Sequence, residues 1–362
     1  MSGRELRHGY TTGACAAAAA AGAARMLRRQ ELADRAEIVL PRGERVAFRL
    51  HGQEFTETWA TCHVVKDAGD DPDVTNGAEI HATVRRESLN RPGARTMVFV
   101  TGGRGVGTIT KPGLAVPVGE PAINPVPMRM ITEAVKAEFS VVCLPQILTV
   151  TVSIPNGEEL AKKTLNARLG IVGGLSILGT TGIVRPISAK AWTDTLDAAI
   201  DVALACGCRT LVLSTGRTSE LVAQEALAGE HLREEACVMM GDHVGYALRA
   251  CARKGAEQAV LAGQFAKLLK IACGHEQTHV SSSELDLRLL AEWIAATPAA
   301  LHLAPLVEGA NTARQVLEAS GNDPALMELV CGRAREAARL LAPSLRIKVL
   351  LAGYDSTVLY FG

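Results

Sequence analysis

The chain has 362 residues, which is long enough for two domains that each bury a core of their own. Hydrophobic residues make up 48% of the chain and charged residues 21%, so the composition is that of a folded globular protein and excludes a disordered one. The 38 basic and 38 acidic residues cancel, so no overall charge attracts nucleic acid or a membrane surface, and an anionic ligand needs a local site.

The first expected element is the stretch HGYTTGACAAAAAAGAARML at residues 8–27. Alanine has the highest helix propensity, and this predicts a helix capped by Thr11 or Thr12, with Gly13 in its first turn. A signal peptide is the alternative, but the run lacks the large apolar residues of such a segment. We expect the alanines to serve packing, and the exposed first-turn N–H groups at Thr11, Thr12 and Gly13 to receive a substrate carboxylate.

The next elements are β-rich runs separated by Gly, Pro, Asn and Asp. They read AEIVLP, RVAFRLHG, TETWATCHVVKD, AEIHATVRRE and RTMVFVTGG. Few helices separate these runs, so we predict a largely antiparallel sheet. A helix is predicted at PVPMRMITEAVKAEF, where Ile131, Val135 and Phe139 follow helical spacing, and the strand ILTVTVSIP comes next.

Two loops of this half hold candidate ligands. The segment HVVKDAGDDPDVTNGAEI has four aspartates within seven residues, which is more typical of a solvated loop than of a metal site, although Asp67, Asp70 and Asp71 would suit calcium or magnesium. The crossover TLNARLGIVGGLSILGTTGIVRP exposes backbone donors between Arg168 and Arg185, as a multiply carboxylated ligand needs. Its glycines are equally explained by close packing of two segments.

From about residue 189 the rhythm changes to strand, loop and helix, which predicts a parallel sheet with crossover helices. Ligands bind such a sheet where strands end and helices begin. Three of these strand ends read STGR, MGDHVG and AGQFAK. Their glycines, Gly216, Gly241 and Gly263, would let a ligand approach the backbone closely. Asp242 can accept a hydrogen bond from a ribose or an amine. Glycine is also common in such turns without a ligand. No G-x-G-x-x-G follows a strand of this half and the chain has no P-loop motif, so nicotinamide and P-loop nucleotide sites have little support.

Several patterns argue against other classes of protein. The segment GHEQTH at 274–279 contains H-E-x-x-H, but Gly274 interrupts the helix that a zinc protease requires, so we expect no metal site. The nine cysteines lack C-x-x-C spacing, which indicates a reducing cytoplasm rather than a disulfide framework. The longest nearly apolar stretch, at 169–184, is too short and too rich in glycine to span a membrane.

Seven ordered segments, from about residue 8 to at least 295, together resemble the cobalt-precorrin-5B (C1)-methyltransferase family, CbiD. The segments are HGYTTGACAAAAA, KDAGDDPDVTNGAEI, GGRGVGTITKPGL, GEPAINPVPMRMI, PNGEELAKKTLNARLGIVGGLSILGTTGIVRPIS, MGDHVGYAL and GQFAKLLKIACGHEQTH. The resemblance implies methyl transfer from S-adenosylmethionine to ring carbon C1 of a corrin precursor in cobalamin (vitamin B12) biosynthesis. A non-catalytic tetrapyrrole-binding protein of the same pathway is the alternative; it would not bind the methyl donor.

The resemblance also implies an architecture and a set of ligand-binding residues. An α+β domain similar to domain 2 of ribosomal protein S5 is expected over 1–188, where it would bind the corrinoid. A smaller α/β domain with a parallel sheet is expected over 189–362, where it would bind the donor. The expected partner is a small-molecule corrinoid, not nucleic acid or a membrane, and a homo-oligomer is compatible with the sequence.

The expected site residues fall into three groups. The catalytic candidates are His279 and Asp67, although Val280 replaces the serine that ordinarily follows the histidine in the family. The donor site is expected at Gly216, Gly241, Asp242, Gly263 and Lys267. The corrinoid site is expected at Thr11, Thr12, Gly13, Arg168, Gly173, Gly174, Thr180, Thr181 and Arg185.

Overall fold

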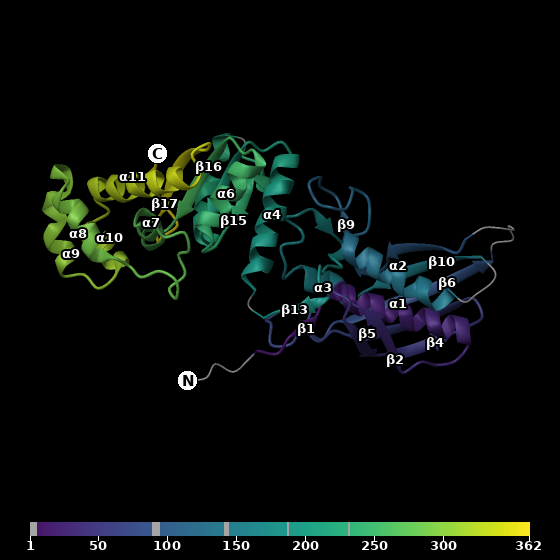
Figure 1. The fold of residues 1–362 in the computed structure, drawn as a ribbon. Helices are drawn as coiled ribbons and strands as arrows, with labels where there is room; N and C mark the ends of the chain where they lie inside the picture. The colour runs from purple at the N-terminus through teal and green to yellow at the C-terminus, as the bar shows by residue number, and fades with distance from the viewer. Residues whose placement is uncertain (1–5, 89–94, 141–144, 187, 231) are drawn as a thin grey trace. The chain divides into compact units, whose positions relative to one another are not determined.

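The computed structural model describes residues 6–88, 95–140, 145–186, 188–230 and 232–362. The chain divides into two compact units, Met1–Ser188 and Ala189–Gly362, which are called the N-terminal and the C-terminal unit below (Figure 1). Each unit has its own hydrophobic core and contains both helices and strands, so the prediction of mixed α and β structure is confirmed. Within the described residues, no helix is long and apolar enough to cross a membrane.

The N-terminal unit is built on a five-stranded sheet in which only one neighbouring pair is parallel, as the sequence predicted. Its strands, in order across the sheet, are β4 (His51–Phe55), β5 (Trp59–Val65), β6 (Glu79–Ser88), β10 (Gln146–Ser153) and β7 (Met97–Gly102), with β10 and β7 parallel. Four two-stranded ladders join the remaining segments: β1 (Gly9–Tyr10) with β13 (Ile183–Val184), β2 (Arg35–Val39) with β3 (Arg45–Arg49), β8 (Gly105–Val106) with β12 (Gly174–Leu175), and β9 (Thr108–Ile109) with β11 (Ile171–Val172).

Two long helices, α1 (Thr12–Arg29) and α2 (Pro125–Phe139), contact each other, and α1 covers one face of this sheet (Figure 1). The short helix α3 (Gly157–Ala161) follows β10. The alanines from Ala16 to Ala20 are completely buried, because small side chains let α1 approach both the sheet and α2. At Gly13, an added Cβ would lie 2.6 Å from Cγ of Pro127, so a glycine is required where the two helices meet. The expected packing role of the alanines is therefore confirmed.

Buried and partly buried residues alternate along β5 and β6, so the two faces of the sheet differ. The buried residues of β5 and β6, such as Cys62 and Ala82, belong to the core beneath the helices. The residues between them, such as His63 and His81, are only partly buried on the opposite face.

The C-terminal unit has a sheet of four parallel strands and one antiparallel strand, so the predicted parallel sheet is confirmed. The strand order is β15 (Cys237–Met239), β14 (Thr210–Ser214), β16 (Gln258–Gly263), β17 (Arg346–Ala352) and β18 (Val358–Phe361). The chain leaves β14 on one side to form β15 and returns on the other side to form β16. This reversal creates a topological switch point at the carboxyl ends of β14 and β16, where ligands bind in sheets of this kind.

The helices of the C-terminal unit connect and extend this sheet. The strand connections contain α4 (Ala189–Ala205), α5 (Arg217–Ala226), α6 (Val244–Lys254) and α7 (Phe265–Ala272). A helical segment between β16 and β17 contains α8 (Leu287–Ala295), α9 (Ala304–Glu308), α10 (Ala313–Ala319) and α11 (Pro324–Leu341). Short 3-10 turns lie at η1 (Ala228–Glu230), η2 (Glu234–Ala236) and η3 (Pro298–Leu303).

Candidate functional site

The switch point of the C-terminal unit combines open space beside a glycine with a buried hydroxyl group. Gly216 is the N-cap of α5, and an added Cβ there would meet nothing within 4 Å. Gly263 is packed instead, since an added Cβ would lie 3.2 Å from Leu268 and 3.3 Å from Thr215. Ser214 ends β14 completely buried, and among the described residues its Oγ has no hydrogen-bond partner. Such an unpaired group is unusual and is suited to a polar ligand.

Asp242 follows β15 and is held by α7 and by the segment after α7. Its Oδ1 accepts hydrogen bonds from Lys267 Nζ and from Thr278 Oγ1, the latter at 2.6 Å. The Thr278 N–H donates to the Asp242 carbonyl at 3.0 Å, and Lys267 also donates to the Thr278 carbonyl at 3.1 Å. The structure thus brings together two residues that were predicted to bind the donor, and adds Thr278 as their shared partner.

The carboxyl group of Asp242 is ionised at neutral pH. Burial by itself would raise its pKa, but the hydrogen bonds from Lys267 and Thr278 outweigh burial and hold the pKa below the usual range. A fixed negative charge beside the switch point can accept hydrogen bonds from hydroxyl or ammonium groups of a ligand.

An aromatic side chain lies beside Gly241, which has a positive φ of 59°. The indole ring of Trp192 would come within 3.0 Å of an added Cβ at Gly241, and its Nε1 donates to the Met240 carbonyl at 3.2 Å. The same indole stacks with His243 at a centroid distance of 5.9 Å. Sequence reasoning missed Trp192 because it lies on α4, far along the chain from the MGDHVG turn.

His279 lies exposed immediately after Thr278. Its Nδ1 is 2.7 Å from Ser281 Oγ, and the preceding residue, Thr278, bonds to Asp242 through its side chain and its backbone N–H. The H-E-x-x-H letters do not lie on a helix, because α7 ends at Ala272. Glu276 instead pairs with Arg249 at 2.5 and 2.6 Å, so this segment lacks the geometry of a zinc protease.

In the N-terminal unit, Thr11 caps α1 by accepting a hydrogen bond from the Ala14 N–H at 3.2 Å, as predicted. The Gly13 N–H donates to the Leu178 carbonyl at 3.0 Å. Thr11 and Thr12 are only 6% and 3% exposed. The expectation that these N–H groups are exposed and receive a carboxylate is therefore wrong for Thr11 and Gly13, because the carbonyls of Gly182 and Leu178 already accept from them.

The loop that occupies the start of α1 contains further predicted residues. The carbonyls at the two ends of this loop, those of Leu178 and Gly182, accept hydrogen bonds from backbone N–H groups at the start of α1. Between them, Thr180 is exposed and Thr181 is half-buried, bonding through Oγ1 to the Ile183 carbonyl at 3.1 Å. Arg185 follows β13 and is exposed. The structure thus gathers Thr11, Thr12, Gly13, Thr180 and Thr181 in one place.

The other end of the glycine-rich crossover packs against the segment 105–111. An added Cβ at Gly174 would collide with the backbone of Gly105, so close packing explains this glycine. Gly173 is exposed, with a φ of 84° and open space where a Cβ would lie. Arg168 is half-buried, and its carbonyl accepts a hydrogen bond from Lys111 Nζ at 3.3 Å. A ligand-binding role for Arg168 and Gly173 stays a prediction.

Asp67 forms a two-point ion pair with Arg7, at 2.5 and 2.9 Å, and also accepts a hydrogen bond from the Gly69 N–H at 2.9 Å. The bond from Arg7 is the main reason why the pKa of Asp67 lies below its usual range. A carboxylate in this state is a weak base, so its contacts favour holding the loop in place over proton transfer.

Comparison with known proteins places these features in a family. Residues 1–186 match the family model CbiD, and residues 277–361 match the model of the CbiD C-terminal domain. The chain belongs to the CbiD family. A "Cobalt-precorrin-5B C(1)-methyltransferase" from Geobacter sulfurreducens is 98% identical over 362 residues, which cover 100% of both chains. A protein of the same name from Geobacter metallireducens is 77% identical, again over 100% of both chains.

A solved CbiD structure, described as a cobalamin biosynthesis protein from Archaeoglobus fulgidus, is 29% identical to this chain. The match covers 75% of this chain and 81% of the solved chain, with a TM-score of 0.39. The resemblance to CbiD that the sequence motifs indicated is therefore confirmed by the family models and by the curated relatives.

Proposed function

We propose that this CbiD chain transfers a methyl group to carbon C1 of cobalt-precorrin-5B in cobalamin biosynthesis, with S-adenosylmethionine as the donor. The observation that carries this proposal is identity of 98%, over the full length of both chains, to a protein named for that reaction. When bound, S-adenosylmethionine supplies a methyl group that its sulfonium has already activated. The work left to the protein is to align two ligands and to expose one carbon to the methyl group.

We propose that the C-terminal unit binds the donor at the switch point. The residues present fit such a ligand, since Ser214 has a buried hydroxyl without a partner among the described residues and Gly216 leaves space where a side chain would otherwise lie. Asp242 is ionised and can accept hydrogen bonds from the ribose hydroxyls or the ammonium group. The Trp192 indole beside Gly241 offers a flat apolar surface of the kind on which a purine stacks.

We propose that the N-terminal unit, with a fold like domain 2 of ribosomal protein S5, binds the corrinoid. The substrate carries several carboxylate arms, and guanidinium groups bind carboxylates at two points. The exposed Arg185 and Thr180, together with the half-buried Arg168, are therefore the proposed anchors. Of the two catalytic candidates, His279 follows Thr278, which bonds to Asp242 at the proposed donor site, whereas Asp67 is engaged with Arg7.

The compartment proposed for this reaction is the cytoplasm. All eight cysteines within the described residues are free thiols, as expected in a reducing compartment. Both units are proposed to act within one chain, whether or not that chain forms a homo-oligomer.

The proposal is tested by incubating the protein with cobalt-precorrin-5B and S-adenosylmethionine labelled at the methyl group. NMR of the product should place the label on C1. Label on another carbon would refute the regiochemistry, and failure to bind the donor, with or without corrinoid, would favour a non-catalytic tetrapyrrole-binding protein.

The roles of the two units are tested by binding measurements on matched variants. Asp242→Ala should weaken donor binding by roughly tenfold to a hundredfold, as expected for the loss of a hydrogen bond to a charged group, and should leave corrinoid binding unchanged. Arg168→Ala should have the converse effect. The controls are Asp194→Ala and Arg45→Ala, which remove exposed charges paired with Lys190 and Glu37. Exchanged effects of the two test variants would overturn the assignment.

A further inference from the structure

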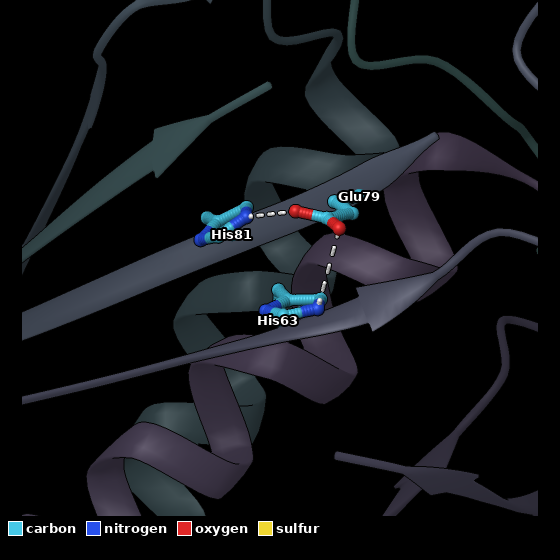
Figure 2. A group of neighbouring side chains, drawn as sticks. All are labelled: His63, Glu79 and His81. Atoms are coloured by element: carbon cyan, nitrogen blue, oxygen red, sulfur yellow. Dashed lines mark hydrogen bonds and ion pairs between the residues drawn. The ribbon is translucent and has the colours of Figure 1, made fainter. Parts of the chain in front are cut away.

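Three side chains outside the candidate sites converge on the sheet face opposite the helices, as Figure 2 shows. His63 on β5 and His81 on β6 are direct cross-strand partners, and Glu79 precedes His81 by two residues and so lies on the same face. One ligand atom from each side chain lies within 4.8 Å of the other two. Nε2 of His81 is 3.0 Å from one carboxylate oxygen of Glu79, and Nε2 of His63 is 3.9 Å from the other.

We propose that His63, Glu79 and His81 form a binding site for a divalent first-row transition metal ion, with Zn²⁺ as the expected occupant. Two imidazole nitrogens and a carboxylate oxygen are ligands that zinc accepts. Two ligand atoms of a tetrahedral zinc ion lie roughly 3.3 Å apart, given bonds of about 2.0–2.1 Å. The 3.0 Å from His81 to one Glu79 oxygen is close to that value, and the 3.9 Å from His63 runs to the other oxygen, so a small rotation of the Glu79 side chain is needed to bring one oxygen to both imidazoles.

The backbone of β4 holds His63 in the orientation that this site needs. Gly52 has a positive φ of 56°, and an added Cβ there would lie 2.9 Å from Nδ1 of His63. Nδ1 is therefore buried against the neighbouring strand, and Nε2 is the nitrogen that faces Glu79. His63 also stacks on His51, the cross-strand partner one strand further along, at a centroid distance of 5.6 Å. A bound ion would complete its coordination with water or with His51.

The position of the cluster defines what a bound ion would do. The side chains of His63 and His81 are 14% and 28% exposed and that of Glu79 is 51% exposed, so the ion can exchange with solvent. The ion would join two neighbouring strands of the central sheet and so stabilise the N-terminal unit. Binding shifts the unfolding equilibrium by mass action, so the effect is measurable without any enzyme assay.

The test is titration of the full-length, metal-free protein with ZnCl₂, followed by calorimetry and by the unfolding temperature. The wild type should bind one ion at this site and unfold at a higher temperature. Glu79→Gln and His81→Asn should each weaken binding by at least about tenfold, since even outer-shell substitutions cost zinc sites about 10–100-fold. His302→Asn is the matched control, because it removes an exposed histidine paired with Asp323 in the C-terminal unit.

Free thiols also bind zinc, so the ligand type needs a second readout. The absorption spectrum of the Co²⁺-loaded protein should lack the strong near-ultraviolet bands of thiolate ligation. The proposal is overturned if no saturable binding is seen, if the spectrum shows thiolate ligands, or if both Glu79→Gln and His81→Asn bind zinc as the wild type does. Circular dichroism of each variant separates loss of the site from loss of the fold.

Discussion

The sharpest prediction concerns Lys66, a lysine that is only 2% exposed and lies at the start of the loop 66–77. Its Nζ donates to Asp73 at 2.6 Å, and Asp73 also accepts hydrogen bonds from the N–H and Oγ1 of Thr75, at 2.7 and 2.6 Å. This ion pair links the first residue of the loop to Asp73 within it. The backbone carbonyl of the next residue, Asp67, accepts a hydrogen bond from the Tyr10 N–H in β1. Lys66→Met keeps the apolar stem and removes the ammonium group.

The expected loss of stability follows from what the substitution leaves behind. Removing one partner of a buried ion pair costs about 3–5 kcal/mol, because the other charge stays buried without compensation. The Asp73 side chain is 24% exposed and keeps both bonds from Thr75, so the lower end of that range, about 3 kcal/mol, is expected here. Lys162→Met is the control: its partner is Glu159, both side chains are well exposed, and the loss should stay below about 1 kcal/mol.

Urea unfolding measures these differences. Of the three tryptophans, only Trp59 lies in the N-terminal unit, so a Trp192→Phe/Trp293→Phe background lets fluorescence report on that unit alone. Adding Asp73→Asn to Lys66→Met removes the stranded charge and should restore part of the stability. A loss below about 1 kcal/mol for Lys66→Met, or no recovery in the double variant, would refute the reasoning.

The same pair predicts a dependence on pH. Burial would raise the pKa of Asp73, but the hydrogen bonds from Lys66 and Thr75 outweigh burial and hold the pKa below the ordinary carboxyl value. A lowered pKa in the folded state gives stability that is present above the ordinary carboxyl pKa and is lost as pH falls through the lowered one. The difference between wild type and Lys66→Met should therefore shrink as the pH falls below about 4.

Two further predictions follow from packing in the N-terminal unit. Gly13→Ala should destabilise the N-terminal unit by about 1–3 kcal/mol in the Trp59 fluorescence assay, because its Cβ would press on Pro127. The control is Gly332→Ala on α11, where an added Cβ would meet only Glu328 Oε1 at 3.9 Å; it should be neutral or stabilising by up to about 1 kcal/mol when urea unfolding of the whole chain is followed by circular dichroism. Burial raises the pKa of the Cys15 thiol to about 12, so Cys15 should resist alkylation at pH 8 in the folded protein and react once the protein is unfolded. Mass spectrometry of the labelled peptide measures the difference. Rapid labelling of Cys15 in the folded protein would contradict the packing of α1.

The sequence predicted those parts of the fold that depend on local patterns. The alanine run has high helix propensity and a threonine cap, and α1 begins at Thr12 with Thr11 as its N-cap. The repeated strand, turn and helix of the second half leaves few alternatives to a parallel sheet. The three turns with Gly216, Asp242 and Gly263 therefore come to one sheet edge, as the pattern implied.

What the sequence did not reveal depends on contacts between distant residues. Leu178 covers the start of α1 from a loop far along the chain, so the first-turn N–H groups only looked free. His63 and His81 meet because β5 and β6 pair in one particular register, and a shift by one residue would place them on opposite faces. The polar alternation in TCHVV and EIHAT was the available signal, but it does not specify the register.

The segment GHEQTH illustrates how backbone geometry decides what a motif means. On a continuous helix, His275, Glu276 and His279 would be arranged as in a zinc protease, but here α7 ends at Ala272 and the segment turns back toward β15. Thr278 then reaches Asp242 through both its side chain and its backbone N–H. The same letters therefore build a support that fixes a carboxylate at the end of a strand. Such a fixed carboxylate suits an enzyme whose chemistry requires positioning more than proton transfer.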